Sequence, residues 1–242
     1  MLAPVSLDRD DKVLDIGIGP GRWIMDLTTS VDSSVPMVAV DIEPRLFPAS
    51  PPENIEFWIE SVTKLPSDWT DAFSLVYQWL LILALQVPQW PQATKEIFRV
   101  LRPGGWVQFA ESTPWHEGKY PGKLSMEKLA AMYRRIAEAR NLYVDCTYDI
   151  PKMLEETGFV DIQNESRMQL LGKRAGEISI EKAKNHVGVL RGIKTPVLEA
   201  GGYGYATSEA EDAIADALGK EWDKTPGSDE DFIITWARKP LA

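Results

Sequence analysis

The residues best suited to chemistry lie in one short run near the amino terminus. Asp15 is part of an apolar segment and is followed by glycines at alternate positions, Gly17, Gly19 and Gly21. Glycines let the backbone turn tightly and approach a ligand closely, because no Cβ stands in the way. An apolar helical pattern follows, and the first amides of a helix attract anionic groups. The run therefore predicts a nucleotide-sized cradle between a strand and a helix.

Two details of this run argue against a dinucleotide as the ligand. Arg22 stands where a Gly-x-Gly-x-x-Gly pattern would place its last glycine, and its side chain would crowd the helix–strand contact. The Asp15 carboxylate would repel a pyrophosphate, whereas it would attract an amino group or a sulfonium. We therefore expect neither NAD nor FAD to bind.

The run resembles the first motif of class I S-adenosylmethionine (SAM) methyltransferases. In that family an acidic residue precedes the glycine loop, and the loop wraps the methionine part of SAM. The resemblance implies SAM as the cofactor, held by Asp15, Gly17, Gly19 and Gly21. It also implies an α/β, Rossmann-like class I methyltransferase fold, with a seven-stranded, mostly parallel sheet and helices on both faces.

A second acidic position follows at a suitable distance. Residues 35–40 are typical of a buried strand, which ends at Asp41, twenty residues after Gly21. A carboxylate offers two acceptor oxygens to a diol, so Asp41 is predicted to bind the ribose hydroxyls. An ordinary turn acid at the end of a strand is the alternative explanation. Ile42 is placed to cover the adenine or ribose face.

Two further strands end at polar residues. Residues 55–59 alternate like a third strand and run into Glu60, Ser61 and Val62. The family resemblance implies that Glu60 reads the adenine amino group with a neighbouring backbone amide, although Ser61 and Val62 differ from the commoner acidic pair. Residues 73–78 form the fourth expected strand, ending at Gln78, whose edge of the sheet should face both SAM and the methyl acceptor.

The next segment carries the most specific motif. Residues 89–101 are expected to form a helix, 102–105 a sharp turn and 106–111 a fifth strand, and the run Phe-Arg-Val-Leu-Arg-Pro-Gly-Gly-Trp matches the post-helix motif of the class I fold. The whole span 13–111 closely resembles the fungal methyltransferases grouped around the secondary-metabolism regulator LaeA. That group includes both regulators and enzymes that act on small metabolites.

The second half of the chain is less diagnostic. Helical patterns are expected at residues 124–141, 150–157, 180–200 and 208–222, and strands at 159–163 and 232–237. Ser208 and the following residues have the form of a capping box. No repeat or linker divides the chain. We therefore expect a single domain over residues 1–242, with 113–150 as a lid insertion over the active site and an N-terminal cover that is short or missing.

Candidate catalytic residues follow the fifth strand. A base is needed only if the acceptor must lose a proton, and the candidates are Glu111, at the end of that strand, and His116, in the loop beyond it. Trp115 and Tyr120 either wall an acceptor pocket or anchor the loop. His186 is interpreted as a surface or lid residue.

Composition narrows the partners. The 242 residues carry a net charge of −10, which argues against a nucleic-acid partner because such proteins usually present a basic stripe. One cysteine and two distant histidines predict no disulfide and no metal site. We found no apolar run of membrane length and no signal peptide, so a cytoplasmic location is expected, with the nucleus left open.

Three function classes follow from these observations. The first is a SAM-dependent methyltransferase acting on a small-molecule acceptor, such as a fungal secondary metabolite. The second is a regulator of the LaeA kind that works through protein partners. The third is a SAM-binding fold that catalyses a rearrangement or cyclisation without methyl transfer. A protein partner and a homodimer both remain open, as does the acceptor atom.

Overall fold

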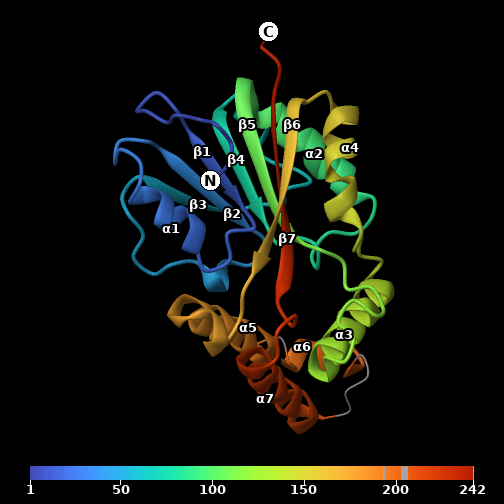
Figure 1. Cartoon of the computed structure of the whole chain (residues 1–242). Helices are drawn as coiled ribbons and strands as arrows, with labels where there is room; N and C mark the ends of the chain where they lie inside the picture. Colours follow the sequence, from blue (N-terminus) through green and yellow to red (C-terminus); the bar gives the residue numbers. More distant parts are fainter. Residues whose placement is uncertain (193, 203–206, 242) are drawn as a thin grey trace. The chain divides into compact units, whose positions relative to one another are not determined.

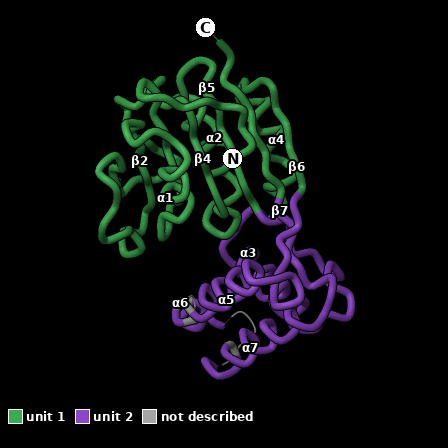
Figure 2. The backbone as a smooth tube through the Cα atoms, turned by 60° about the vertical axis from the view of Figure 1, so that its left-hand side comes forward, with its two compact units in different colours: residues 1–111, 145–166, 233–242 green, residues 112–144, 167–232 purple. Residues whose placement is uncertain are grey.

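The computed structural model describes residues 1–192, 194–202 and 207–241. The chain forms two compact units, coloured separately in Figure 2. The first unit contains residues 1–111, 145–166 and 233–242, and the second contains residues 112–144 and 167–232. Residues 113–144 of the expected insertion thus share the second unit with later helices, whereas residues 145–150 belong to the first unit, and the role of 113–150 as a lid stays a prediction.

A seven-stranded sheet forms the centre of the fold (Figure 1). The spatial order of its strands is β3-β2-β1-β4-β5-β7-β6, and the pairs β1–β2, β1–β4, β2–β3 and β4–β5 are parallel. The predicted Rossmann-like α/β fold is confirmed. The strands are Val13–Ile16 (β1), Met37–Asp41 (β2), Ile55–Ile59 (β3), Phe73–Trp79 (β4), Leu101–Ser112 (β5), Val160–Gln169 (β6) and Glu230–Arg238 (β7).

The strand β7 runs against the direction of β5. The backbones of Lys239 and Gly105 are hydrogen-bonded, and the Thr113 amide donates to the Asp231 carbonyl, so residue numbers rise on one strand while they fall on the other. This antiparallel strand makes the sheet mixed, with its parallel part at the amino-terminal half of the chain. In a parallel set, the carboxyl ends of all the strands lie at one edge, where ligands bind in open α/β sheets.

The helices of the first unit are α1 (Arg22–Thr28), α2 (Gln89–Val100) and α4 (Cys146–Thr157). Ile24 and Leu27 of α1 share a buried cluster with Val13 of β1 and Met37 of β2. Because side chains alternate across a strand, the buried residues next to these, such as Leu14, face the other side. Both faces of the parallel strands are therefore covered, as their continuous apolar sequence requires.

The Arg-Pro-Gly-Gly segment is a bulge inside β5 and not a turn ahead of it. Phe73 pairs with Leu101, yet Leu75 already pairs with Trp106. The extra residues of β5 must loop out between these two pairs. A Cβ on Gly105 would lie 3.0 Å from the carbonyl oxygens of residues 102 and 73, so the bulge has no room for a side chain there.

Several boundaries in the second half differ from the sequence expectation. The expected helix at 180–200 is two helices, α5 (Glu177–Gly192) and α6 (Lys194–Glu199), and residue 193 between them lies outside the described residues. The helix α7 (Ser208–Lys224) begins after Thr207, whose hydroxyl accepts the Ala210 amide, so Ser208 is not the cap. The side chain of Glu211, the other member of the expected capping box, lies outside the described residues. In addition, α4 begins at Cys146, four residues before the expected start at residue 150, and β6 extends to Gln169, beyond the expected end at residue 163.

The second unit is held together by contacts between α7 and α3 (Leu124–Arg140). The two carboxylate oxygens of Glu221 accept the Ser125 and Met126 amides, each at 3.0 Å. These two amides belong to the first turn of α3, and amides of a first turn have no acceptor within their own helix. Trp222 is fully buried beside them, with its indole Nε1 3.2 Å from the Met126 sulfur.

Replacing Glu221 should therefore destabilise the second unit. We expect Glu221→Ala to cost about 1–2 kcal/mol of unfolding free energy, as for the loss of other helix caps, because two amides lose their acceptor. Urea denaturation would measure it. Lys220→Ala, on the exposed side of the same helix, should change stability by less than about 0.5 kcal/mol. Equal stability of the two variants would contradict the capping role.

Candidate functional site

The loop after β1 has the backbone that alternating glycines predict. Gly17, Gly19 and Gly21 have φ of 70°, 50° and 75°, in the left-handed region that other residues rarely adopt. The amides of Gly17 and Ile18 both donate to the Val40 carbonyl, at 2.9 and 3.2 Å. The loop is therefore tied to the end of β2 before it enters α1.

The Asp41 carboxylate makes a second tie between β2 and this loop. Its Oδ2 accepts the Gly19 amide at 2.9 Å, and its Oδ1 accepts the Glu43 amide at 3.0 Å. Asp41 therefore lies beside the glycine loop, and its binding of ribose hydroxyls stays a prediction. Each carboxylate oxygen has a second acceptor position, so an oriented and partly exposed Asp41 can still accept hydroxyl groups from a diol.

Asp15 is a buried carboxyl at the end of β1, with only 3 % of its surface exposed. Burial raises the pKa of Asp15 well above its ordinary range, and the negative charge of Asp41 raises it further. A cation beside Asp15 would favour the ionised form and lower the energetic cost of burying it. The site thus suits a ligand that carries positive charge near Asp15 and a diol near Asp41.

A second buried polar group lies where β4 and β5 end. Gln78 is fully buried, and among the described residues its Oε1 has no hydrogen-bond partner. Its Nε2 lies 3.5 Å from Glu111, whose two oxygens accept the Leu81 and Ile82 amides at 2.9 and 3.0 Å. Burial raises the pKa of Glu111 to about 8, although these hydrogen bonds oppose the shift. An unpartnered buried carbonyl oxygen is costly, so a donor group on a ligand would stabilise Gln78.

Exposed apolar side chains lie at or just after the carboxyl ends of three of the parallel strands. Ile42 comes directly after β2, Ile59 ends β3, and Trp79 and Leu80 lie at the end of β4. Large apolar side chains that gather on a surface mark a place where a ligand or partner binds. Their position at the carboxyl edge of the parallel strands agrees with the polar groups described above.

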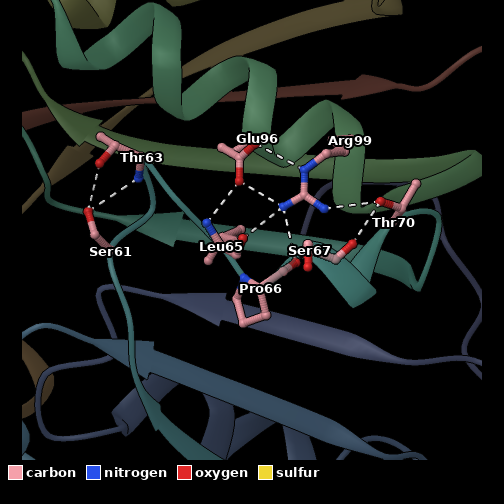
Figure 3. A network of polar contacts seen from close by, with 8 residues as sticks. All are labelled: Ser61, Thr63, Leu65, Pro66, Ser67, Thr70, Glu96 and Arg99. Carbon is pink, nitrogen blue, oxygen red and sulfur yellow. Dashed lines mark hydrogen bonds and ion pairs between the residues drawn. The ribbon is translucent and has the colours of Figure 1, made fainter.

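The segment after β3 is held by a polar network (Figure 3). Arg99 of α2 donates to the Leu65 and Pro66 carbonyls and pairs with Glu96, and Glu96 in turn accepts the Leu65 amide at 2.8 Å. This network anchors residues 65–70 to α2. The predicted adenine-reading residues lie just before it, Glu60 and Ser61 partly buried and Val62 buried.

The two predicted catalytic residues have different surroundings. Glu111 is buried in the first unit, whereas His116 is exposed in the second. His186, interpreted as a surface or lid residue, is only partly exposed, with Nδ1 3.3 Å from the Glu230 carboxylate, and its role in a lid stays a prediction. Burial by itself would lower the pKa of His186, but the Glu230 charge and hydrogen bond raise it. Trp115 and Tyr120 are buried within the second unit.

Sequence reasoning missed the partners of Glu111. Leu81 and Ile82 belong to the apolar run 79–85, whose side-chain types give no sign that its backbone amides bind a carboxyl group. Leu80, just before them, has φ of 57°, unusual for a leucine. The sequence offers one signal. Gln78 and Glu111 are polar residues at the ends of neighbouring strands, where their side chains can bind the backbone that follows the strand.

Searches for other kinds of site give two negative findings. Over the ranges 1–192, 194–202 and 207–241, no cluster of three or more His, Cys, Asp or Glu residues could hold a metal ion. Within the same ranges, no helix is both long enough and apolar enough to cross a membrane.

Comparison with known proteins agrees with the geometry. Residues 13–105 match the family model of a methyltransferase domain. N-methyltransferase gliN of Aspergillus fumigatus is 35% identical over 139 residues, which are 54% of this chain and 49% of that protein. N-methyltransferase sirN of Leptosphaeria maculans is 26% identical over 269 residues, covering 99% of this chain and 85% of that one. The match to gliN therefore spans about half of that protein's length.

Solved structures show the same fold at low identity. A phosphoethanolamine N-methyltransferase 2 of Haemonchus contortus, in complex with S-adenosyl-L-methionine, superimposes with a TM-score of 0.59 at 15% identity, over 98% of this chain and 50% of that one. The [4+2]-cyclase SpnF superimposes with a TM-score of 0.57 at 18% identity, over 98% of this chain and 78% of that one.

The raised pKa of Glu111 predicts how stability depends on pH. Its ordinary value is 4.5 and its folded value is about 8, so between these pH values the folded protein keeps a proton that the unfolded chain has lost. Stability should therefore fall as pH rises from about 4.5 to 8, at up to about 1.4 kcal/mol per pH unit. Glu111→Gln removes this contribution and should give a flatter profile in denaturation at several pH values. Glu155 is an exposed glutamate on α4, so Glu155→Gln should keep the wild-type slope. A Glu111→Gln profile as steep as that of the wild type would refute the raised pKa of Glu111.

Proposed function

We propose that this chain is a SAM-dependent methyltransferase with the class I, Rossmann-like fold, acting on a small-molecule acceptor; its residues 13–105 match the family model of a methyltransferase domain. One observation carries the proposal. The buried Asp15 carboxyl and the Asp41 carboxylate lie at either side of a left-handed glycine loop, at the carboxyl edge of parallel strands. This arrangement fits a ligand with a cationic part and a ribose.

The residues of the first unit fit SAM. Asp15 would hold the cationic methionine part, and Asp41 would accept the ribose hydroxyls. Ile42 is exposed beside Asp41 and would cover the adenine or ribose, while Glu60, Ser61 and Val62 would surround the adenine. Gln78, whose buried oxygen has no partner within residues 1–192, 194–202 and 207–241, would receive a donor from SAM or from the acceptor. When bound, SAM supplies an already activated methyl group.

The protein's contribution to such a transfer is mainly alignment. A rigid loop and oriented carboxyl groups hold the donor so that an acceptor can approach in line. Where the acceptor must lose a proton, a base is required. Both oxygens of Glu111 already accept backbone amides, so His116, which is exposed, is the better candidate for a base that meets a substrate.

The acceptor is proposed to be a nitrogen of a small molecule, such as a fungal secondary metabolite. The support is that relatives over much or all of this chain, gliN, sirN and verN, are named N-methyltransferases. The acidic net charge does not favour nucleic acid as the acceptor. A cytoplasmic location, with the nucleus as the alternative, remains a proposal from the sequence, as does a homodimer.

Two alternative functions keep specific support. The Asp-x-x-Pro, Pro-Pro-Glu-Asn and Arg-Pro-Gly-Gly-Trp-Val-Gln motifs resemble the LaeA group, so a regulatory role through protein partners is a second candidate. The fold is also shared with a [4+2]-cyclase, so fold similarity by itself is compatible with a reaction that transfers no methyl group.

Binding of SAM tests the cofactor assignment. Asp41→Ala should weaken SAM binding by about 2–4 kcal/mol, because the ribose loses a charged acceptor and the glycine loop loses its tie. Isothermal titration calorimetry would measure this. Asp32→Ala is a matched control, since Asp32 also accepts the amide two residues onward, and it should bind SAM normally. NADH should not bind. Unchanged affinity of Asp41→Ala, or stabilisation by NADH and not by SAM, would overturn the assignment.

The reaction is tested by following the label from methyl-labelled SAM. Incubation with a panel of small amines and amides should give products that carry the labelled methyl group on nitrogen, detected by mass spectrometry. His116→Ala should lower kcat roughly 10²-fold or more if His116 is the base. A product without the label would favour the cyclase-like alternative. No product from any acceptor, together with specific capture of a partner protein, would favour the regulatory one.

The lid proposal is tested separately. If residues 113–150 cover the site, the loop 115–123 should become more protected from hydrogen exchange when SAM is added, because a closed site excludes water. The exposed loop at residues 32–34 serves as an internal control and should exchange at the same rate throughout. No added protection at 115–123 would exclude this segment as a lid.

A further inference from the structure

The carboxyl group of Glu111 binds a backbone segment at close range, whereas the Gln78 side-chain amide lies 3.5 Å from it. Its Oε1 and Oε2 accept the consecutive amides of Leu81 and Ile82, which follow the end of β4. We propose that Glu111 is a positioning residue that holds the segment 80–82 against the glycine loop and thereby shapes the SAM site. This inference rests on the proposed function, because it assigns the glycine loop to SAM.

The segment that Glu111 holds is conformationally strained. Leu80 has φ of 57°, and its amide donates to the Ala110 carbonyl at 3.1 Å. A left-handed conformation of a non-glycine residue is costly and persists only where surrounding contacts require it. Glu111 follows Ala110 directly, so the end of β5 contacts three consecutive residues, through one carbonyl and one carboxylate. These three hydrogen bonds supply the required constraint.

Leu81 transmits this constraint to the glycine loop. A Cβ built on Gly17 would lie 2.7 Å from Leu81 Cδ2, so the leucine side chain fills the space beside that glycine. Gly17 itself has a left-handed backbone, and its amide donates to the Val40 carbonyl. Loss of the Glu111 contact would free Leu81 to move away, and the loop would lose its packing partner on that side.

The geometry argues against Glu111 as the base. The side chain is fully buried, and its two oxygens are engaged by amides, with the Gln78 amide a further 3.5 Å neighbour. A base must reach the proton that it removes within hydrogen-bond distance. An anchor of this kind affects the acceptor chemistry only through the backbone that it holds.

A double-mutant cycle tests the coupling. Glu111→Gln keeps one acceptor but presents an amide N–H group to a backbone N–H, and Leu81→Ala removes the packing on Gly17 alone. We expect each to raise the dissociation constant for SAM about tenfold, measured by calorimetry. Because both act through the same contact, the double variant should show about tenfold rather than hundredfold weakening. In the unliganded protein, both should speed hydrogen exchange of the amides at 17–21.

A buried carboxylate at the opposite end of the sheet provides the control. Asp11 accepts the Ser74 hydroxyl and the Asp8 amide and pairs with Arg102. Asp11→Asn should lower the melting temperature but leave SAM affinity within about twofold and the exchange at 17–21 unchanged.

The outcomes are distinct. Lower turnover of Glu111→Gln with unchanged SAM affinity and unchanged loop exchange would overturn the proposal, as would fully additive effects of the two substitutions. If Glu111→Gln fails to fold, Leu81→Ala still decides, since normal affinity and normal exchange in that variant would also overturn it. If the wild-type protein binds no SAM, the proposed function fails, and the exchange experiment on the unliganded variants still decides whether Glu111 positions the loop.

Discussion

The hydrogen bond from the Gly19 amide to the Asp41 carboxylate joins the two strands on which the site depends. It links the turn after β1 to the end of β2, and the Gly17 and Ile18 amides strengthen that link through the Val40 carbonyl. A charged acceptor makes such a bond stronger than one between neutral groups. The loop is therefore shaped before any ligand arrives, which lowers the entropy that binding must remove.

The carboxyl edge of the sheet concentrates groups that are costly to bury. Asp15 and Glu111 both have raised pKa values because of burial, and Gln78 has an unpartnered oxygen within the part of the chain that the structure describes. Sites with perturbed pKa values and unsatisfied polar groups are frequently functional. Here the positive charge and donor groups of a ligand would relieve these costs, so the same features that weaken the fold favour binding.

Backbone segments around the edge are held by long side chains of neighbouring helices and strands. Arg99 and Glu96 of α2 bind the backbone of residues 65–70, and Glu111 binds that of 81 and 82 (Figure 3 shows the first of these). Loops lack the regular hydrogen bonds of helices and strands, so their backbone groups need other partners. Supplying those partners from charged side chains gives each loop one preferred conformation, as a binding site requires.

Local signals in the sequence predict the parallel strands and the tight glycine loop after the first of them. These features depend on local spacing, on the special freedom of glycine, and on the rule that parallel strands present their carboxyl ends at one edge. The helices expected at 124–141 and 150–157 end close to their expected residues, and the left-handed residues Asn141 and Gly158 cap them.

Packing between elements selects which distant groups meet. Glu111 lies about thirty residues from the amides that it binds, and His186 contacts Glu230, forty-four residues later. The bulge in β5 arises from its register with β4, and Thr207 rather than Ser208 caps α7. Such contacts are selected by packing between elements, and a side chain's type and spacing say little about which backbone will come within its reach.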